Sequence, residues 1–286
     1  MRLSIVIVNW NTRAYLLEAL ESIHAQMPDV GWEVIVVDNA SHDGSGAAVA
    51  DRYPGVHLIE NGDNAGYARG NNQGIERSSG EFVLLLNPDV VLPPSTLERA
   101  MAILSGASNA AALGVRLVGA DGVVQRSIRG FPTPLAVACE ALGLSRLFPH
   151  SRLLASYRMP WFDYDAPSEV DQPMGTFLLI RRAALESIGA LDERFPIFFN
   201  EVDWCLRARR KGFTILYTPE VEILHYGGAS TRQAAPAMAW ESRRGLLRFL
   251  RKHYPGPQYA PLYWVAVWTS WLYAGWTGIR RSRRSG

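Results

Sequence analysis

The sequence predicts an α/β fold in which helices flank a mostly parallel central sheet. Over the first hundred residues, short apolar runs alternate with stretches whose apolar residues recur at helical spacing, which is the pattern of β–α–β units. The chain has 286 residues, 48% of them hydrophobic and 20% charged, so it is long enough to bury a sizeable core and is not disordered throughout. These observations are typical of one large domain, alone or with an appendage.

The expected elements follow one another without an internal repeat. Buried strands are expected at 3–8, 33–37, 56–59 and 82–86, and helices at 14–25 and 67–78. In the less regular second half, we expect a strand at 175–180, helices at 182–188 and 202–210, and short strands at 214–217 and 221–224. The last of these leads directly to His225.

Polar side chains stand where the expected strands end, namely Asn9, Asp38 and Asp89. In an open α/β sheet, ligands bind beyond the carboxyl ends of the strands, so these three residues should converge on one crevice. Carboxylate and amide oxygens suit Mg²⁺ or Mn²⁺, and Mg²⁺ is typically bound by one or two carboxylates together with substrate phosphates. A metal-bound nucleoside diphosphate fits such an edge, although each Asp or Asn taken singly is more often a turn or helix cap.

Several other classes of site are excluded. The chain has no Gly-rich loop ending in Gly-Lys-Ser/Thr and only two lysines, Lys211 and Lys252, so it is not a P-loop enzyme. The Gly44–Gly46 turn lacks the third glycine of a dinucleotide fingerprint. The two cysteines, Cys139 and Cys205, cannot form a disulfide framework or a four-ligand zinc site.

Charge is divided unevenly along the chain. Residues 1–240 carry 20 basic and 26 acidic side chains, a net charge of −6, whereas residues 241–286 carry nine basic side chains and one acidic side chain, a net charge of +8. This division indicates an anionic partner for the tail only and argues against nucleic-acid binding by the body. The first residues lead straight into an apolar strand without the pattern of a secretory signal, so we expect the protein in the cytoplasm.

The order and spacing of several motifs resemble a known family. The motifs are SIVIVNWNT, VIVVDNASHDGS, NAGYARGNNQGI, LLLNPDV, MGTFLLI and FFNEVDW, within a resemblance that covers residues 3–231. Together they resemble the family 2 inverting glycosyltransferases of GT-A fold, and within them the rhamnosyltransferase-like enzymes of cell-surface polysaccharide assembly. The resemblance implies transfer of a sugar, with rhamnose from dTDP-rhamnose as the best guess, from a nucleoside diphosphate donor to a hydroxyl of a lipid-linked or polysaccharide acceptor.

The resemblance also implies roles for particular residues. Residues expected to bind the donor are Asn9, Asp38, Asn39, Asn64, Arg69, Asn71 and Asn87, with Asp38 on the base or ribose and Asn64, Arg69 and Asn71 on the diphosphate side. Asn87-Pro88-Asp89 stands at the family's Asp-x-Asp signature, so Asp89 is expected to carry most of the binding of Mg²⁺ or Mn²⁺. His225 is expected to complete the metal or diphosphate site.

A second signature, Asn200-Glu201-Val202-Asp203-Trp204, opens a helix and supplies two catalytic candidates. Glu201 is the expected base, since transfer to a sugar hydroxyl needs a carboxylate that accepts its proton. Asp203 would face away from Glu201 on a helix, where it would bind the acceptor or cap the helix start. Two other functions remain open. One is an inactive nucleotide-sugar-binding partner subunit, because Asn replaces an acid at Asn87 and Asn200. The other is a nucleotidyltransferase, because such enzymes share the metal, the carboxylates and the α/β sheet.

The tail is expected to be a separate unit, with the glycosyltransferase domain at 1–235 and a membrane-associating segment at 236–286. Residues 259–279 carry no charge and lie between basic residues. This uncharged stretch of 21 residues is long enough to span a bilayer. However, Trp264, Trp268 and Trp271 share one helical face, and Trp prefers the headgroup level. We therefore expect a helix lying on an anionic cytoplasmic leaflet, with a single span and docking on the protein's own body as the alternatives.

Overall fold

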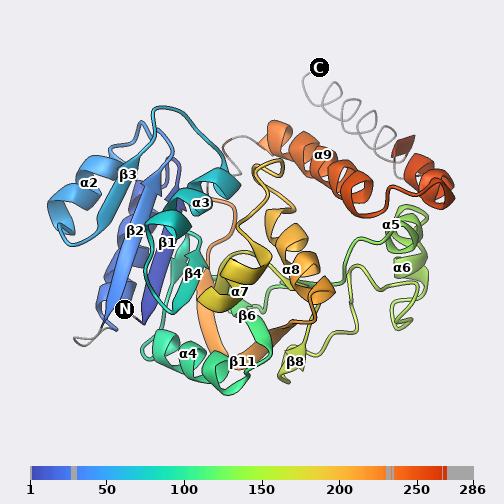
Figure 1. The fold of residues 1–286 in the computed structure, drawn as a ribbon, viewed down its shortest axis with the longest axis horizontal. Coiled ribbons are helices and arrows are strands. Elements are labelled where there is room, and N and C mark those ends of the chain that lie inside the picture. Colours follow the sequence, from blue (N-terminus) through green and yellow to red (C-terminus); the bar gives the residue numbers. More distant parts are fainter. Residues whose placement is uncertain (1, 27–30, 230–232, 234, 266, 269–286) are drawn as a thin grey trace.

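A nine-stranded sheet lies at the centre of the computed structural model, with helices against both of its faces (Figure 1). The structure describes residues 2–26, 31–229, 233, 235–265 and 267–268. The expected α/β fold with a helix-flanked central sheet is confirmed.

The bounds of the elements are as follows. The strands are β1 (Leu3–Asn9), β2 (Trp32–Asp38), β3 (His57–Glu60), β4 (Phe82–Leu86), β5 (Val90–Val91), β6 (Ala110–Val118), β7 (Ile128–Arg129), β8 (Ser168–Glu169), β9 (Gln172–Pro173), β10 (Phe177–Arg181) and β11 (Thr214–His225). The helices are α1 (Arg13–His24), α2 (Ser45–Arg52), α3 (Tyr67–Arg77), α4 (Thr96–Gly106), α5 (Pro134–Ala141), α6 (Leu144–Leu147), α7 (Arg182–Ile188), α8 (Asn200–Arg210) and α9 (Ala235–His253), followed by the 3₁₀ turn η2 (Pro257–Tyr259).

The sheet is parallel in one half and mixed in the other. Its order is β3-β2-β1-β4-β10-β6-β11-β5, with the ninth strand, β8, paired to β11 outside this order. The first four strands run parallel, as the sequence predicts. Strand β10 is antiparallel to both β4 and β6, so the parallel character does not extend across the sheet. This reversal is important for the site because it pairs Phe177 with Leu86 and so brings residues 174–176 beside Asn87.

Alternation along the strands divides the core between the two faces of the sheet. Strand β1 is buried along its whole length. Its residues Leu3, Ile5 and Ile7 pack with α1, α2 and α4 on one face, whereas Val6 and Val8 pack with α3, α7 and α8 on the other. A strand covered on both sides in this way reads as a continuous apolar run, which is why the sequence indicated it clearly.

One strand differs from the sequence expectation. The two short strands expected at 214–217 and 221–224 form the single strand β11, whose pairing with β6 shifts register between Thr218 and Glu222. Pro219 lies within this irregular stretch, and proline is tolerated in sheets mainly at such breaks in the ladder. The continuous strand ends at His225, which pairs with Val90 and therefore lies beside Asp89.

Helix α9 packs on the body of the protein, although the domain boundary was expected at its start. Phe249 is fully buried against Phe195, Phe199 and other apolar residues around α8, and Leu250 packs with Val137 of α5. Within the described residues, no helix is long and apolar enough to cross a membrane. Trp271 and the other residues of the expected span after 268 lie outside the described part of the chain.

Candidate active site

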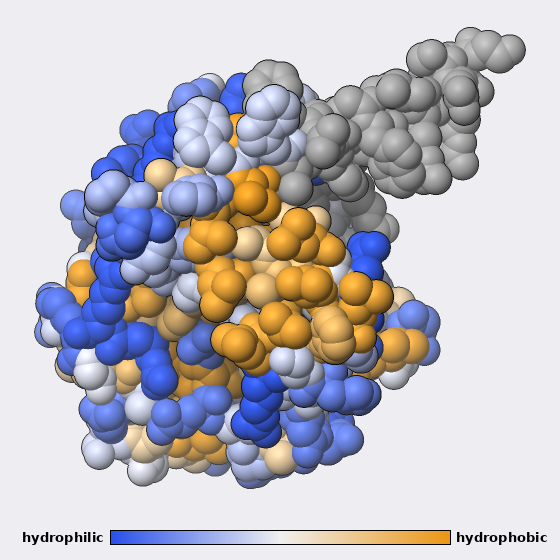
Figure 2. All heavy atoms as spheres, turned by 90° about the vertical axis from the view of Figure 1, so that its right-hand side faces the viewer, coloured by the Kyte–Doolittle hydropathy of each residue, from blue (hydrophilic) through white to orange (hydrophobic). Residues whose placement is uncertain are grey.

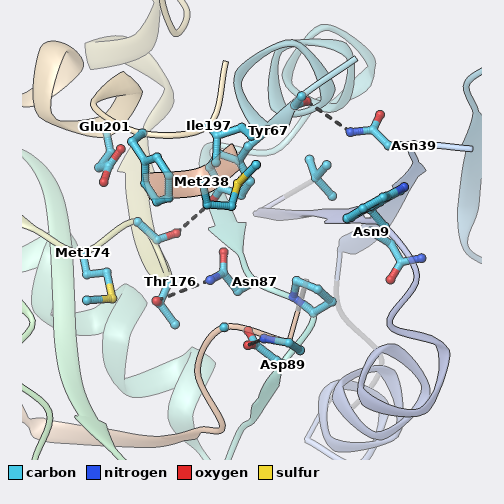
Figure 3. Close-up of a pocket in the computed structure, with 18 of the residues that line it drawn as sticks. Asn9, Asn39, Tyr67, Asn87, Asp89, Met174, Thr176, Ile197, Glu201 and Met238 are labelled. Carbon is cyan, nitrogen blue, oxygen red and sulfur yellow. Dashed lines mark hydrogen bonds between the residues drawn. The ribbon is translucent and has the colours of Figure 1, made fainter. Parts of the chain in front are cut away.

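A pocket of about 330 Å³ lies beyond the carboxyl ends of β1, β2 and β4, where the sequence predicts a crevice (Figure 3). Seven of the residues expected to bind donor or metal or to catalyse transfer are in its wall: Asn9, Asn39, Asn64, Asn87, Asp89, Glu201 and His225. They come from both halves of the sheet and from the start of α8, so the fold assembles them across about 200 residues of sequence.

The first side of the pocket is organised by Asp38. This carboxylate is buried and accepts hydrogen bonds from Asn9 Nδ2 at 2.7 Å, from Ser41 Oγ at 2.7 Å and from the Ser41 N–H at 2.9 Å. Asp38 therefore fixes Asn9 and the turn that follows β2, while Asn9 and Asn39 themselves reach the pocket. Asn39 Nδ2 donates to Gly66 O at 3.2 Å, which ties this turn to the start of α3.

The start of α3 forms the next part of the wall. Asn64 Oδ1 accepts from the Gly66 N–H at 3.1 Å. Gly66 has φ +85°, and a Cβ there would lie 2.9 Å from Pro196 O, so this close approach requires glycine. Of the other two residues expected on the diphosphate side, Arg69 is exposed outside the pocket wall, and Asn71 is fully buried beneath it with its Nδ2 donating to Tyr67 O at 2.8 Å.

The floor of the pocket is where β4 and β10 meet. Asn87 Nδ2 lies 3.5 Å from Thr176 Oγ1, and the Asn87 N–H donates to Thr176 O at 2.9 Å. The Tyr67 hydroxyl donates to Gly175 O at 2.8 Å and closes the opposite wall. Tyr67, Met174, Thr176 and Met238 are wall residues that the sequence did not indicate, although the first three lie in or beside the motifs that carry the resemblance.

Asp89 and His225 form the pair expected to bind metal. Both side chains are buried, and His225 Nε2 lies 3.5 Å from Asp89 Oδ1. Asp89 Oδ2 also accepts from the Ala229 N–H at 3.1 Å. Burial acts to raise the pKa of Asp89, but the His225 ring, in the protonated form whose Nε2–H faces the carboxylate, and the Ala229 N–H together outweigh burial and hold this pKa below its usual value.

Gln125 determines which nitrogen of His225 carries the proton. Gln125 Nε2 donates to the backbone oxygen of His225 at 2.8 Å, so its Oε1 is the atom that lies 2.7 Å from His225 Nδ1. Because a carbonyl oxygen only accepts, Nδ1 must donate, and the neutral ring presents the lone pair of Nε2. That nitrogen is buried without a hydrogen-bond partner.

This pair fits a divalent metal. A buried imidazole lone pair 3.5 Å from a carboxylate oxygen is an arrangement that a shared cation would satisfy. Within the described residues no cluster of three or more His, Cys, Asp or Glu side chains could hold a metal alone. A site with two protein ligands suits Mg²⁺ or Mn²⁺ that also binds substrate phosphates. Asp89 and His225 are the residues that would hold such a metal, with Gln125 behind them.

Glu201 is the one acidic side chain of the second signature that lies in the pocket wall. Burial raises the pKa of its carboxyl to about 7, against the opposing effect of the N–H groups of Glu201 and Val202. A carboxyl with this pKa accepts a proton near neutral pH, which is the property of a general base. The preceding residue Asn200 is fully buried and its Nδ2 donates to Ile197 O at 2.8 Å, which holds the loop before α8.

Asp203 faces away from the pocket, in the direction expected for a residue two positions from Glu201 on a helix. It is fully buried and accepts from Arg207 Nε at 2.8 Å, from His253 Nε2 at 2.7 Å and from Lys252 Nζ. Burial opposes its charge, but these three partners outweigh burial and hold the pKa of Asp203 below its usual value. Two of the partners, Lys252 and His253, belong to α9, so Asp203 joins α8 to α9.

The sequence model described as "Glycosyl transferase family 2" matches residues 4–189, about two thirds of the chain. The chain belongs to glycosyl transferase family 2. This glycosyltransferase is 30% identical over 267 residues to the N-acetylglucosaminyl-diphospho-decaprenol L-rhamnosyltransferase of Mycobacterium tuberculosis, a match that covers 88% of this chain and 86% of the relative. It is also 22% identical over 258 residues to the rhamnosyltransferase WbbL of Escherichia coli, covering 87% and 92% of the two chains.

Solved glycosyltransferases share the fold. The mannosyltransferase PcManGT from Pyrobaculum calidifontis, solved in complex with GDP-Man and Mn²⁺, superposes with a TM-score of 0.59 at 18% identity. The match covers 94% of this glycosyltransferase and 69% of that chain. The expectation of a GT-A glycosyltransferase is confirmed.

Proposed function

We propose that this glycosyltransferase is a metal-dependent, inverting enzyme that moves a sugar from a nucleoside diphosphate to a hydroxyl of a lipid-linked acceptor. The observation that carries the proposal is the place of Glu201 in one pocket with Asn9 and Asn39 on one side and the Asp89–His225 pair on the other. A base and a pair that would bind the diphosphate then line the same pocket.

In the proposed reaction, the Glu201 carboxylate accepts the proton of the acceptor hydroxyl while its oxygen bonds to the anomeric carbon of the donor. The bond from that carbon to the diphosphate oxygen breaks at the same time, and the single displacement inverts the anomeric configuration. A divalent metal held by Asp89 and His225 would neutralise charge that develops on the diphosphate. Asn9, Asn39, Asn64 and Asn87 would position the donor, with Asp38 holding Asn9 in place.

Substrate identity is proposed from the relatives. The Mycobacterium tuberculosis relative is named for transfer of rhamnose to N-acetylglucosaminyl-diphospho-decaprenol, and the Escherichia coli relative is also named a rhamnosyltransferase. We therefore propose rhamnose from dTDP-rhamnose as the donor and a sugar linked through diphosphate to a polyprenyl lipid as the acceptor. Mg²⁺ or Mn²⁺ is the proposed metal, which is consistent with Mn²⁺ in the solved PcManGT complex.

A peripheral position on the cytoplasmic face of the membrane completes the proposal. Hydrophobic side chains gather on the face that carries α5 and α6 (Figure 2). The large exposed ones in this region are Leu135, Leu142, Leu147, Phe148 and Leu153, which we call the α5–α6 apolar face. Residues 132–161 contain three arginines and one acidic residue, in contrast to the acidic body. An apolar face with a basic surround is typical of binding to an anionic membrane surface.

The test is transfer by the purified protein. We expect dTDP release from dTDP-rhamnose when a synthetic N-acetylglucosaminyl-diphospho-prenol and Mn²⁺ are present, with a product of inverted anomeric configuration by NMR. Glu201→Gln should reduce turnover about 10²- to 10⁴-fold with dTDP affinity retained. Glu186→Gln, an exposed carboxyl on α7, is the matched control and should retain activity.

Other outcomes identify the two alternatives that the sequence left open. Tight dTDP-rhamnose binding without dTDP release, with the acceptor present, would indicate a binding subunit. Release of pyrophosphate in place of a nucleoside diphosphate would indicate a nucleotidyltransferase. Transfer from a different nucleotide sugar would retain the mechanism and correct the donor.

A further inference from the structure

Phe199 immediately precedes α8 and has an unusual backbone conformation. Its φ is +71° and its ψ is 0°, in the left-handed region that glycine adopts freely and that a residue with a Cβ adopts only with strain. The carbonyl oxygen of Phe199 accepts from the Asp203 N–H at 2.9 Å, so the hydrogen bonding of α8 begins at this residue. The conformation of Phe199 therefore sets the direction of the first turn of α8, which carries Glu201.

The Phe199 ring packs against the backbone of α9. The ring is buried beside Gly245, where a Cβ would lie 2.8 Å from Phe199 Cδ2 and 3.4 Å from Phe198 O. Cβ atoms essentially never approach another atom to 2.8 Å, so this contact requires glycine at position 245. Glycine is otherwise less favourable than alanine in the interior of a helix. Phe249, one turn further along α9, also covers the ring, with 5.9 Å between the two ring centroids.

The first turns of α8 have α9 on one side and the pocket on the other. Phe199, Val202 and Leu206 pack with Phe249 in one apolar cluster. These three positions of α8 are separated by three and four residues, so they share one face of the helix. Glu201 is two residues beyond Phe199, about 200° around the helix, and therefore lies on the opposite face, in the pocket wall.

The pocket side of Glu201 is also closely packed. A Cβ at Gly175 would lie 3.5 Å from Glu201 Cγ, so the backbone at Gly175 runs along the Glu201 side chain. The Tyr67 hydroxyl holds this backbone by donating to Gly175 O at 2.8 Å (Figure 3). A shift of the first turn of α8 would therefore move Glu201 relative to a wall that is fixed separately.

Helix α9 is held against α8 by ion pairs as well as by apolar contacts (Figure 1). Lys252 and His253 both contact the buried carboxylate of Asp203. Lys252 also pairs with Asp192 at 2.7 Å. Because these contacts keep α9 in place, a side chain added at Gly245 should displace the start of α8 and not α9.

We infer that the contact between Phe199 and Gly245 positions the catalytic base, because it holds the first turn of α8 in the orientation that directs Glu201 into the pocket. The inference rests on the proposed function, in which Glu201 is the base, and it makes Phe199 and Gly245 positioning residues. A base must lie within hydrogen-bonding distance of the proton that it accepts, and a misplacement of about 1 Å can reduce a rate about 100-fold.

Gly245→Ala tests the inference by adding one methyl group at the contact. We expect kcat for dTDP release to fall about 10- to 100-fold. The KM for dTDP-rhamnose and the dTDP affinity should stay constant, because the donor side of the pocket does not contact α8 through Phe199. Gly106→Ala is the matched control, since it makes the same change at the end of α4, where a Cβ meets nothing within 4 Å. This control should have the kcat of the wild type.

A second substitution tests whether the contact itself is responsible. Phe199→Leu/Gly245→Ala replaces the ring with a shorter side chain and leaves room for the methyl group. Residues in direct contact are coupled, so the double variant should recover at least about threefold of the kcat that Gly245→Ala loses. If the two single substitutions reduce kcat by factors that simply multiply in the double variant, the two residues do not act through one contact and the inference is wrong.

The pKa of Glu201 gives a measurement that needs no transfer reaction. Burial raises this pKa to about 7, so a shift of Glu201 into the pocket, where its carboxyl gains water, should lower the pKa in Gly245→Ala. Carboxyl ¹³C NMR follows the titration, and Glu201→Gln identifies the signal. Phe199→Leu, which weakens the contact without adding volume, should also lower this pKa and replaces Gly245→Ala if that variant does not fold.

The two measurements separate this inference from the proposed function. A wild-type pKa of Glu201 in the folded variant would overturn the inference, and the proposed function would still stand if the wild type transfers the sugar. If no acceptor supports dTDP release by the wild type, the proposed function fails. A lowered pKa of Glu201 in Gly245→Ala would then still support the placement of this side chain by Phe199 and Gly245.

Discussion

Gln125 holds His225 at two points, through its Oε1 at 2.7 Å from Nδ1 and through its Nε2 at 2.8 Å from the backbone oxygen. The two contacts fix the ring's proton on Nδ1 and direct the Nε2 lone pair toward Asp89. A residue outside the pocket wall thereby presents the Nε2 lone pair that the proposed metal would need.

Replacing Gln125 should weaken metal binding more than it changes any other property of the site. Gln125→Leu removes the acceptor for Nδ1–H, so we expect the Mn²⁺ dissociation constant to rise about 10- to 100-fold. The measurement is Mn²⁺ titration in the presence of dTDP, followed by electron paramagnetic resonance. Gln125→Glu keeps an acceptor and should retain more affinity than Gln125→Leu, and Val123→Ala in the neighbouring turn should change nothing. Unaltered Mn²⁺ affinity in Gln125→Leu would show that the proton position of His225 is set in another way.

The half-buried Glu201 side chain should control the pH profile of transfer. Because burial raises the pKa of Glu201 to about 7, kcat/KM should fall tenfold per pH unit below about pH 7 and level off above it. Glu201→Gln should remove this decrease of kcat/KM at low pH, together with most of the turnover. If the decrease at low pH remains in Glu201→Gln, a group other than Glu201 causes it.

The same raised pKa has a consequence for stability. A carboxyl whose pKa is higher in the folded state than in the unfolded state favours folding below its unfolded pKa, and this contribution is lost as the pH rises through about 7. Glu201→Gln should therefore melt at a higher temperature than the wild type at pH 8, with a smaller difference at pH 5. Calorimetry at the two pH values tests this, and Glu186→Gln should show no such trend.

Sequence patterns predict the pocket residues at the strand ends, but they do not predict residues that hold those side chains from elsewhere in the chain. Asn9, Asp89 and Glu201 could be placed because buried parallel strands and an acidic helix start leave strong local patterns. Gln125 could not, since it lies 100 residues from His225 in an irregular segment and acts through hydrogen bonds that leave no periodicity. Arg69 is the opposite case: it belongs to a motif that carries the resemblance and is expected to bind the donor, but on α3 its side chain is exposed outside the pocket wall.

The tail shows a further limit of sequence patterns. The basic residues after 240 indicate an anionic partner, and Lys252 is one of these basic residues. In the structure, Lys252 and His253 contact the buried carboxylate of Asp203, and Phe249 fills a space beside Phe199. A sequence does not show whether a basic residue is paired with a buried carboxylate or exposed to solvent, because that depends on tertiary packing.

Asp203 should therefore behave as a stabilising residue. Asp203→Asn leaves the cations around it without their shared carboxylate, and we expect a loss of roughly 3 kcal/mol in the free energy of unfolding at pH 7. Because the pKa of Asp203 is lowered in the folded state, this contribution is present above the unfolded pKa of about 3.9 and is lost progressively as the pH falls from there through the lower folded pKa. Denaturant unfolding at pH 7 and pH 3.5 measures the difference. If Asp203→Asn is as stable as the wild type but loses turnover to the extent expected for Glu201→Gln, Asp203 takes part in catalysis.

Truncation distinguishes the two parts of the tail. Ending the chain after Ser242 removes Phe249, Leu250, Lys252 and His253, so the product should unfold or aggregate. Ending it after Gly256 keeps α9 and should preserve dTDP binding and the cooperative melting transition. If the shorter product binds dTDP with wild-type affinity, α9 is dispensable and the boundary at 235/236 stands as first expected.

The α5–α6 apolar face should drive membrane binding together with basic residues. Substituting Leu142, Leu147 and Leu153 with Gln removes three side chains that are 64%, 70% and 63% exposed. If each inserts partially and contributes about 1 kcal/mol, co-sedimentation with phosphatidylglycerol vesicles should weaken about 100-fold. Raising the salt to 1 M should weaken wild-type binding as well, because the arginine contribution is screened.

The variant must retain its active site for this result to bear on the membrane. Transfer to an uncharged octyl glycoside should be unchanged in the triple variant, since none of the three leucines lines the active-site pocket. Val123→Gln, at another exposed apolar position, should bind vesicles like the wild type. If the triple variant binds vesicles normally while truncation after Gly256 abolishes binding, the membrane contact belongs to the chain beyond α9 and not to the α5–α6 apolar face.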